Sequence, residues 1–383
     1  MFLITCIEAI KNSGVSLSIQ NENRSLLFVL ILVFASFYFN VLPYIIKFLD
    51  INIVSSYYTL NTITEDTFIV SFVISIVFFV VSSVLLIYYH FSGALVRNLN
   101  YSPKIPFLFE LIFAVAVILI TKDHFSQSRD VIKSGSTLVS EIIIISSISI
   151  CSYKLLIDKR IIPSLLRFLF ISYVAIVIFE REFFLFAVIP LILRVRVTGK
   201  SLIVLSISSV VLMSTVLLYK DLVNYSRGQS INNSTNGVLY KLGVDTIHKL
   251  SLEVSYIDGE NVPNYKPFSL VSPYQIPRFV EPERTTNSRL ATNYYTGGNT
   301  GTGFSSWLEG YINFGMAGIA LVPLIVILII HLTTGILGQS TLIPLLIFAI
   351  KYNRAELWPL LISMVIFPSL VIYIISKLSM RRE

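Results

Sequence analysis

Uninterrupted apolar runs of about twenty residues recur along this chain, and they constrain its fold more than any other feature. Each long run suffices for one helix to cross a bilayer, because a span needs about 20 mainly apolar residues. Hydrophobic residues make up 55% of the 383-residue sequence and charged residues only 13%, with a mean hydropathy of +0.78. A soluble domain carries about 25% charged residues, so the excess apolar surface must face lipid. The sequence therefore predicts an all-α polytopic membrane protein.

Ten apolar runs qualify as candidate membrane-spanning helices, and the sixth and ninth of them are short. The runs cover residues 26–46, 67–89, 105–121, 137–153, 161–179, 183–193, 201–219, 316–331, 341–350 and 357–376. We expect the short runs to be tilted, longer than their apolar limits, or re-entrant, so the predicted number of spans is about ten. The runs are mostly free of charge, and no internal repeat divides the chain. Residues 1–383 are therefore expected to form a single integral membrane domain.

Basic residues are concentrated in the connections that follow alternate spans. These connections are residues 90–104, 154–160 and 194–200, together with the tail at 377–382. Because cytoplasmic loops carry the excess of lysine and arginine, the alternation places both termini in the cytoplasm and residues 220–305 outside it, in the periplasm of a bacterium. The net charge of +7 forms no basic stripe with interleaved aromatic residues. No nucleic-acid partner is therefore expected.

The external segment 220–305 is the one sizeable polar region, and it is too long for a plain connector. It contains Arg227, Arg278, Arg284 and Arg289, and a further arginine, Arg181, lies between two apolar runs. Guanidinium groups hold phosphate in a planar, permanently charged fork, so all five are candidates for binding a pyrophosphate. The alternative is that they are ordinary solvated loop charges, paired with neighbouring glutamates.

A glycine-rich turn at 297–303 leads into a helix that carries Glu309 just before a long apolar run. Ser305, Glu309 and Asn313 are spaced by four residues and therefore share one face of this helix. An ionisable residue at the membrane edge needs a partner or a functional reason, which makes Glu309 a candidate catalytic base. His248, the only histidine of the external segment, is the competing candidate. The alternatives are a structural pair between Glu309 and an arginine, and a structural histidine.

Motifs for several other chemistries are absent from the sequence. It contains no HExxH, GxSxG or paired-aspartate metal motif, no Cys/His zinc spacing and no dinucleotide fingerprint. Its two cysteines, Cys6 and Cys151, form no CxxC pair. These observations argue against a protease, a cytosolic nucleotide-sugar transferase and a P-loop pump. They predict neither a metal nor a cofactor.

Two stretches near the end of the polar segment form a familiar pair. Ile276-Pro277-Arg278-Phe279 is followed by Pro282 and Arg284, and the run from Gly303 to Gly315 contains Glu309, Tyr311 and then Asn313-Phe314-Gly315. Both resemble elements of the bacterial O-antigen and oligosaccharide repeat-unit polymerases. The motif resemblance covers about residues 276–318, whereas the layout of spans with one large, late external loop covers most of the chain. One departure is Arg284, where the basic residue of the family is lysine.

The resemblance implies a lipid-dependent glycosyltransferase with an all-helical, GT-C-like membrane fold in the bacterial inner membrane. It implies transfer of a growing glycan from undecaprenyl pyrophosphate onto a new lipid-linked repeat unit at the periplasmic face, as in O-antigen (lipopolysaccharide) biosynthesis. Arg181 and Arg278 match the family arginines that hold the pyrophosphate. The implied partners are the undecaprenyl-pyrophosphate-linked oligosaccharide, membrane lipid and a chain-length regulator protein.

Two other functions compete with the polymerase. An O-antigen ligase moves finished glycan onto a lipid acceptor and needs the same donor site, so the sequence separates it poorly from a polymerase. A flippase or other transporter of lipid-linked oligosaccharide belongs to a different class. Transporters usually have short loops, internal repeats and charges near mid-span. The long external segment, the missing repeat and the charge-poor spans therefore favour the enzyme.

Overall fold

The computed structural model describes residues 17–48, 65–122, 138–158, 160–178, 181–194, 305–353 and 357–380. Within these ranges every element is a helix, and no strand is present. Six stretches are long and apolar enough to cross a bilayer, namely Ile19–Ile45, Phe68–Phe91, Val139–Ile157, Ile161–Ile178, Gly315–Tyr352 and Leu361–Ser379. Two shorter apolar helices, Phe107–Thr121 and Phe183–Ile192, accompany them. The all-helical polytopic class is thus confirmed.

The predicted count of ten spans stays a prediction. The expected span at 201–219 and the external segment up to residue 304 lie outside the described residues. The expected spans at 316–331 and 341–350 belong to one apolar stretch, Gly315–Tyr352, which the chain interrupts with a turn at Gly338. Gly338 has a φ of 57°, a conformation that favours glycine.

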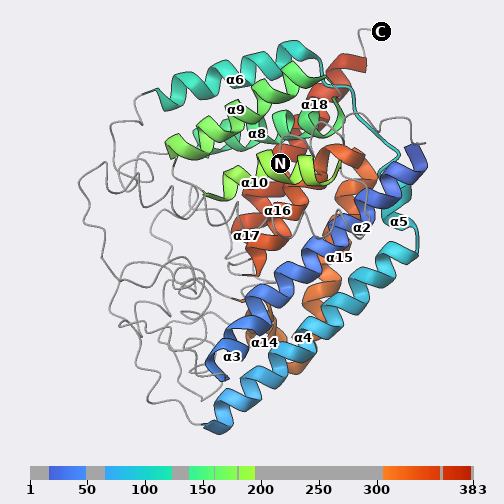
Figure 1. Cartoon of the computed structure of the whole chain (residues 1–383), viewed down its shortest axis with the longest axis vertical. Coiled ribbons are helices and arrows are strands. Elements are labelled where there is room, and N and C mark those ends of the chain that lie inside the picture. Colours follow the sequence, from blue (N-terminus) through green and yellow to red (C-terminus); the bar gives the residue numbers. More distant parts are fainter. Residues whose placement is uncertain are drawn as a thin grey trace.

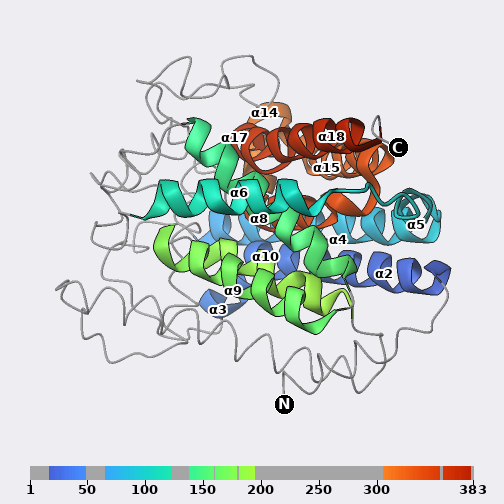
Figure 2. The same cartoon turned by 90° about the horizontal axis from the view of Figure 1, so that it is seen from above.

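The helices form two groups that meet at a buried segment of the chain. The first group contains α2 (Leu17–Ser36) with η1 (Phe37–Val41) and α3 (Leu42–Phe48), α4 (Glu65–Phe91), α5 (Ala94–Asn98), α14 (Ser306–Phe314) with η5 (Gly315–Ala317), and α15 (Gly318–Leu337). The second contains α6 (Phe107–Thr121), α8 (Leu138–Ile157), α9 (Ile161–Ile178), α10 (Arg181–Ile192) and α18 (Phe367–Met380). Between the groups run η6 (Gly338–Thr341), α16 (Leu342–Tyr352), α17 (Leu357–Leu360) and η7 (Leu361–Ile366). In Figure 1, α2, α4 and α15 run side by side, and from above α8 lies between α18 and the pair α9–α10 (Figure 2).

The short helix α16 is the centre of the core. Every residue from Leu342 to Ala349 is buried, and α16 contacts α2, α8, α10 and α15. Its 11 residues extend only about 16 Å, about half of the hydrocarbon thickness. The sequence placed a short ninth span here, and the structure shows why it is short: α16 is covered by protein rather than by lipid.

Other helices keep an apolar face uncovered. Along α4, Val73, Val77, Val80, Val84 and Ile87 follow each other at intervals of three or four residues and are all at least 41% exposed. Such a stripe on a long apolar helix is the surface that a bilayer would cover. Apolar side chains are thus buried inside the bundle and also exposed on its outer surface, which is the distribution expected of a membrane protein.

Contacts between distant segments gather the basic connections at one end of the bundle, called here the basic end. Arg24 Nη2 and Arg194 Nε both donate to the carbonyl of Leu156, at 3.5 and 3.2 Å. Ser379 Oγ donates to the carbonyl of Lys104 at 3.1 Å. The start of α2 and the end of α18 thus lie at the same end as the connections after α5 and α8. The sequence predicted this shared face.

Candidate functional site

The helix α14 places the predicted polar face inside the protein. Ser305 caps the helix, because its Oγ accepts the backbone N–H of Leu308 at 3.4 Å. Gly315, with a φ of 59°, lets the chain leave the helix at its other end. Ser305, Glu309 and Asn313 are 0%, 1% and 3% exposed. The spacing of four residues therefore did identify one face, and that face is turned into the bundle.

Two glycines bring α14 against the first turn of α15. A Cβ atom added at Gly310 would lie 2.7 Å from the carbonyl oxygen of Gly318, and one added at Gly318 would lie 2.0 Å from that of Gly310. The two backbones consequently touch with no side chain between them. Because Gly310 follows Glu309 directly, this contact fixes the position of the carboxylate.

The Glu309 carboxylate meets the beginning of α17. The backbone N–H of Leu357, the first residue of that helix, donates to Oε2 at 3.2 Å and to Oε1 at 3.4 Å. Asn313 Nδ2 donates to the backbone carbonyl of Glu309 at 2.6 Å, and the Tyr352 phenol lies within electrostatic reach of the carboxylate. A hydrogen bond from a backbone N–H stabilises a buried carboxylate because the acceptor carries a charge. Glu309 is therefore held in place at 1% exposure without leaving the polar environment that a carboxylate requires.

Several polar side chains of neighbouring helices, together with Glu309, form what we call the Glu309 cluster: Glu309, Tyr352, Asn353, Ser306 and Asn40. Asn353 Oδ1 accepts hydrogen bonds from Asn40 Nδ2 at 2.8 Å and from Ser306 Oγ at 3.4 Å. Asn40 lies in the π-helical segment η1, a kind of bulge that often occurs at functional sites. The cluster joins η1, α14 and α16, and the helical segment from Arg24 to Asn40, which is α2 followed by η1, separates it from the basic end by about 24 Å of rise.

The surroundings of the other predicted site residues lie outside the described part of the structure. Arg181 begins α10, but its side chain is not described. His248 and the turn at 297–303 lie outside the described residues, as do the loop arginines, which are Arg227, Arg278, Arg284 and Arg289. The pyrophosphate clamp and the competing base His248 thus stay predictions, and Glu309 is the one candidate whose surroundings are known.

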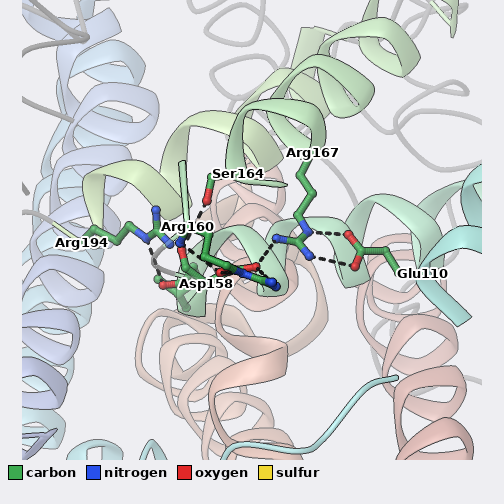
Figure 3. A network of polar contacts seen from close by, with 7 residues as sticks. Glu110, Asp158, Arg160, Ser164, Arg167 and Arg194 are labelled. Atoms are coloured by element: carbon green, nitrogen blue, oxygen red, sulfur yellow. Dashed lines mark hydrogen bonds and ion pairs between the residues drawn. The ribbon is translucent and has the colours of Figure 1, made fainter. Parts of the chain in front are cut away.

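A second polar site, drawn in Figure 3, joins α6, α9 and the connection that follows α8. Arg167 of α9 donates through Nε and Nη2 to the two carboxylate oxygens of Glu110 on α6, with an Nη2–Oε2 distance of 3.0 Å. Arg167 Nη1 also donates to Asp158 Oδ2 at 2.8 Å, and the exposed Arg160 contacts the same carboxylate at 3.1 Å. Arg167 and Glu110 are 7% and 6% exposed. This is a paired network of two cations and two anions rather than a free charge.

The electrostatics of Asp158 follow from these contacts. Partial burial raises the pKa of its carboxyl group, but hydrogen bonds from Arg160 and Arg167 outweigh burial and hold that pKa well below its ordinary value. The same hydrogen bond from Arg160 raises the pKa of the Arg160 guanidinium. The carboxylate therefore stays ionised at every physiological pH, which suits a structural clamp.

This network was not predicted from the sequence, because the apolar runs are mostly free of charge and the few charges in them were given no role. Glu110 and Arg167 lie within two of the predicted apolar runs, and ionisable residues in such runs are functional or structural markers by default. Arg24 precedes the predicted run 26–46 but lies within the apolar stretch Ile19–Ile45 of the structure; it is 3% exposed, and its Nη1 donates to Gln339 Oε1 at 2.7 Å. The signal was present in the residue types, whereas the pairing was not.

Comparisons of the chain with protein-family models, with curated proteins and with solved structures find no match. Among the described residues, no group of three or more His, Cys, Asp or Glu side chains is arranged to hold a metal ion. The interpretation of the site therefore depends on the geometry of the Glu309 cluster and on the sequence motifs.

Proposed function

We propose that this protein is a membrane glycosyltransferase that polymerises lipid-linked oligosaccharide repeat units, with Glu309 as its catalytic base. The observation that carries the proposal is the Glu309 carboxylate, which is 1% exposed, accepts the backbone N–H of Leu357 and interacts with the Tyr352 phenol, far along α2 and η1 from the basic end. A positioned carboxylate shielded from water is suited to take a proton from a sugar hydroxyl. The glycan substrate and its pyrophosphate carrier come from the sequence resemblance over about residues 276–318.

The proposed reaction is a single displacement at the donor sugar. The acceptor hydroxyl oxygen forms a bond to the anomeric carbon, the bond from that carbon to the pyrophosphate oxygen breaks, and the acceptor proton moves to Glu309. The electron pair of the broken bond leaves with undecaprenyl pyrophosphate. Each carboxylate oxygen has two lone pairs, so Glu309 can keep its hydrogen bond from Leu357 and still accept the proton.

The leaving group builds negative charge that needs stabilisation. Preorganised guanidinium groups supply such stabilisation in a site that excludes water. We assign this role to Arg181 and Arg278, with Arg227, Arg284 and Arg289 as further candidates.

The proposed orientation follows from the charges. The basic end, with Arg97, Lys104, Arg160 and Arg194, would face the cytoplasm because positive loops are retained there. The Glu309 cluster would then lie toward the periplasm, where lipid-linked repeat units are joined in the family that the sequence resembles.

Chain length in cells tests the clamp. Arg278→Ala and Arg181→Ala should each abolish long glycans while the protein remains inserted. Each variant loses a charge-assisted contact to the leaving group, and every 1.4 kcal/mol of lost transition-state stabilisation lowers the rate about tenfold. Arg278→Lys should rescue only in part, since lysine lacks the planar fork. Normal chain lengths in both alanine variants would remove the clamp from the proposal.

A transporter is the second candidate, and one structural feature favours it. The helix α16 ends at Tyr352, and the backbone N–H of Leu357 in α17 donates to the buried Glu309 carboxylate; helix ends that meet a charged group inside the bundle also line substrate sites in transporters. Purified protein in vesicles separates the two functions. A polymerase lengthens the glycan on its lipid carrier, whereas a flippase moves the lipid across the bilayer at unchanged glycan length. A ligase instead transfers the glycan to a different lipid acceptor.

A further inference from the structure

A cavity of about 50 Å³ adjoins the Glu309 cluster inside the bundle. Three members of the cluster, Ser306, Tyr352 and Asn353, form part of its wall. From there the cavity extends between α4 and α15, where Ser82 is a further polar side chain of the wall. The remaining lining is largely apolar, so the polar atoms in it are few and well defined.

One hydroxyl group that lines this cavity has no hydrogen-bond partner in the structure. It is Ser82 Oγ on α4, and Ser82 is 7% exposed. The Tyr352 phenol on α16 also lines the cavity and interacts with the Glu309 carboxylate. A buried hydroxyl without a partner costs on the order of 1–3 kcal/mol. Native proteins rarely leave such a group beside a cavity large enough for water unless a bound molecule satisfies it.

Size and chemistry identify that molecule. A buried water needs roughly 10–15 Å³ of accessible volume and two to four polar partners. The cavity is larger than this minimum, and its lining supplies hydroxyl groups from Ser82, Tyr352 and Ser306 and the side-chain amide of Asn353. None of these four groups carries a charge, so neutral water fits the site better than an ion.

We propose that the cavity holds ordered water that hydrogen-bonds Ser82 and Tyr352 and links the Glu309 carboxylate to the interior of the bundle. Tyr352 is the connecting group, because its phenol both lines the cavity and lies within electrostatic reach of Glu309. The Tyr352 hydroxyl can donate to the ionised Glu309 carboxylate while its oxygen accepts a hydrogen bond from the water, so the water holds Tyr352 in the orientation that keeps Glu309 ready to accept the proton of the acceptor hydroxyl. This role in proton transfer rests on the proposed function, whereas the presence of the water does not.

Hydroxyl-radical footprinting of the purified protein in detergent tests for the water. Radicals formed from a bound water oxidise side chains beside it even when bulk solvent does not reach them. Tyr352 and Phe78, which line the cavity, should therefore be oxidised several-fold faster than Tyr44 and Phe186, which are also buried but lie elsewhere. Equally slow oxidation of all four residues would overturn the proposal.

A matched pair of serine variants localises the effect. Ser82→Leu fills part of the cavity and should bring the oxidation of Tyr352 down to that of Tyr44. Ser83→Ala is the control, because the Ser83 hydroxyl is also buried without a partner on the same helix but does not line the cavity. Rapid oxidation of Tyr352 that persists in Ser82→Leu would place the water somewhere else and contradict the proposal. If Ser82→Leu does not fold, the comparison of the four aromatic residues in the unaltered protein still decides.

A separate assay tests the role of the water in proton transfer. Tyr352→Phe removes only the hydroxyl, and it should lower the rate of polymerisation several-fold and shift its pH profile. A purely structural loss would lower the rate without moving the pH profile, and that outcome would overturn the proton-transfer role while leaving the water in place. If the unaltered protein shows no polymerisation at all, the proposed function fails, and the footprinting result is unaffected.

Discussion

Breaking the buried pair between Arg167 and Glu110 is expected to destabilise the protein more than any other single removal of a charge at the basic end. Arg167→Met removes the guanidinium that contacts both Glu110 and Asp158, yet keeps most of the volume of the side chain. Asp158 retains Arg160 as a partner, whereas Glu110 is 6% exposed and loses its cation. Removing one partner of a buried ion pair typically costs about 3–5 kcal/mol. We expect a loss of unfolding free energy of that size.

The matched variants make this expectation specific. Glu110→Leu combined with Arg167→Met replaces the whole pair by apolar groups, an exchange that is often neutral or stabilising. The double variant should therefore recover most of the lost stability. Arg160→Met removes a guanidinium from the same Asp158 carboxylate, but the Arg160 side chain is 76% exposed, so its loss should leave the stability unchanged.

Equilibrium unfolding in mixed detergent micelles, followed by circular dichroism, measures these free energies. The order expected is that Arg160→Met resembles the unaltered protein, the double variant comes close to it, and Arg167→Met is far less stable. Equal stability of Arg167→Met and Arg160→Met would refute the reasoning, because it would show that burial does not strengthen the pair. A double variant as unstable as Arg167→Met would show that the loss comes from packing and not from charge.

Three further results are expected. The pKa of Asp158 is held below its ordinary value, so the contribution of Asp158 to stability should be constant above about pH 4, the ordinary pKa of aspartate. This contribution should decline only as the pH falls further toward the lowered pKa. The difference in melting temperature between the unaltered protein and Asp158→Asn, followed from pH 7 to pH 3, checks this. Gly318→Ala, whose Cβ would lie 2.0 Å from a backbone oxygen of α14, should cost roughly 1–3 kcal/mol of stability and displace the carboxylate, whereas Gly335→Ala on the same helix has room and should do neither. In a cysteine-free background, an impermeant thiol reagent added outside the cell should label Met316→Cys at the end near Glu309 and not Ser92→Cys at the basic end; the reverse labelling would invert the proposed orientation.

The fold class was predictable because hydropathy alone separates a chain that faces lipid from one that does not. Single helices were also well placed: the run 67–89 became α4 at Glu65–Phe91, and the run 161–179 became α9 at Ile161–Ile178. The environment of the ninth run was not predictable, because an apolar stretch looks the same whether lipid or protein covers it. The short length of the predicted run 341–350 was the one available sign that it forms a core helix, which is the 11-residue α16 in the structure.

The candidate site likewise has residues that the sequence predicted and contacts that it did not predict. Glu309 was found because a carboxylate directly before an apolar run is conspicuous in a sequence. Its surroundings were not found, since Asn40 and Asn353 lie 313 positions apart and nothing in either neighbourhood indicates the other. Glu110 and Arg167 were visible as charges within apolar runs, but only packing brings together two residues that are 57 positions apart. Residue types thus reveal candidates, and long-range geometry decides their roles.

The most direct test of the central claim is the single-turnover rate of purified Glu309→Gln with a lipid-linked repeat unit. Glutamine keeps the shape of the side chain and can still accept the N–H of Leu357, but it cannot take the acceptor proton. If Glu309 is the base, the rate should fall by roughly a hundredfold or more at unchanged donor binding, and His248→Ala should have a small effect. A Glu309→Gln enzyme that extends the glycan at close to the unaltered rate would contradict the account and would make His248 the leading candidate for the base.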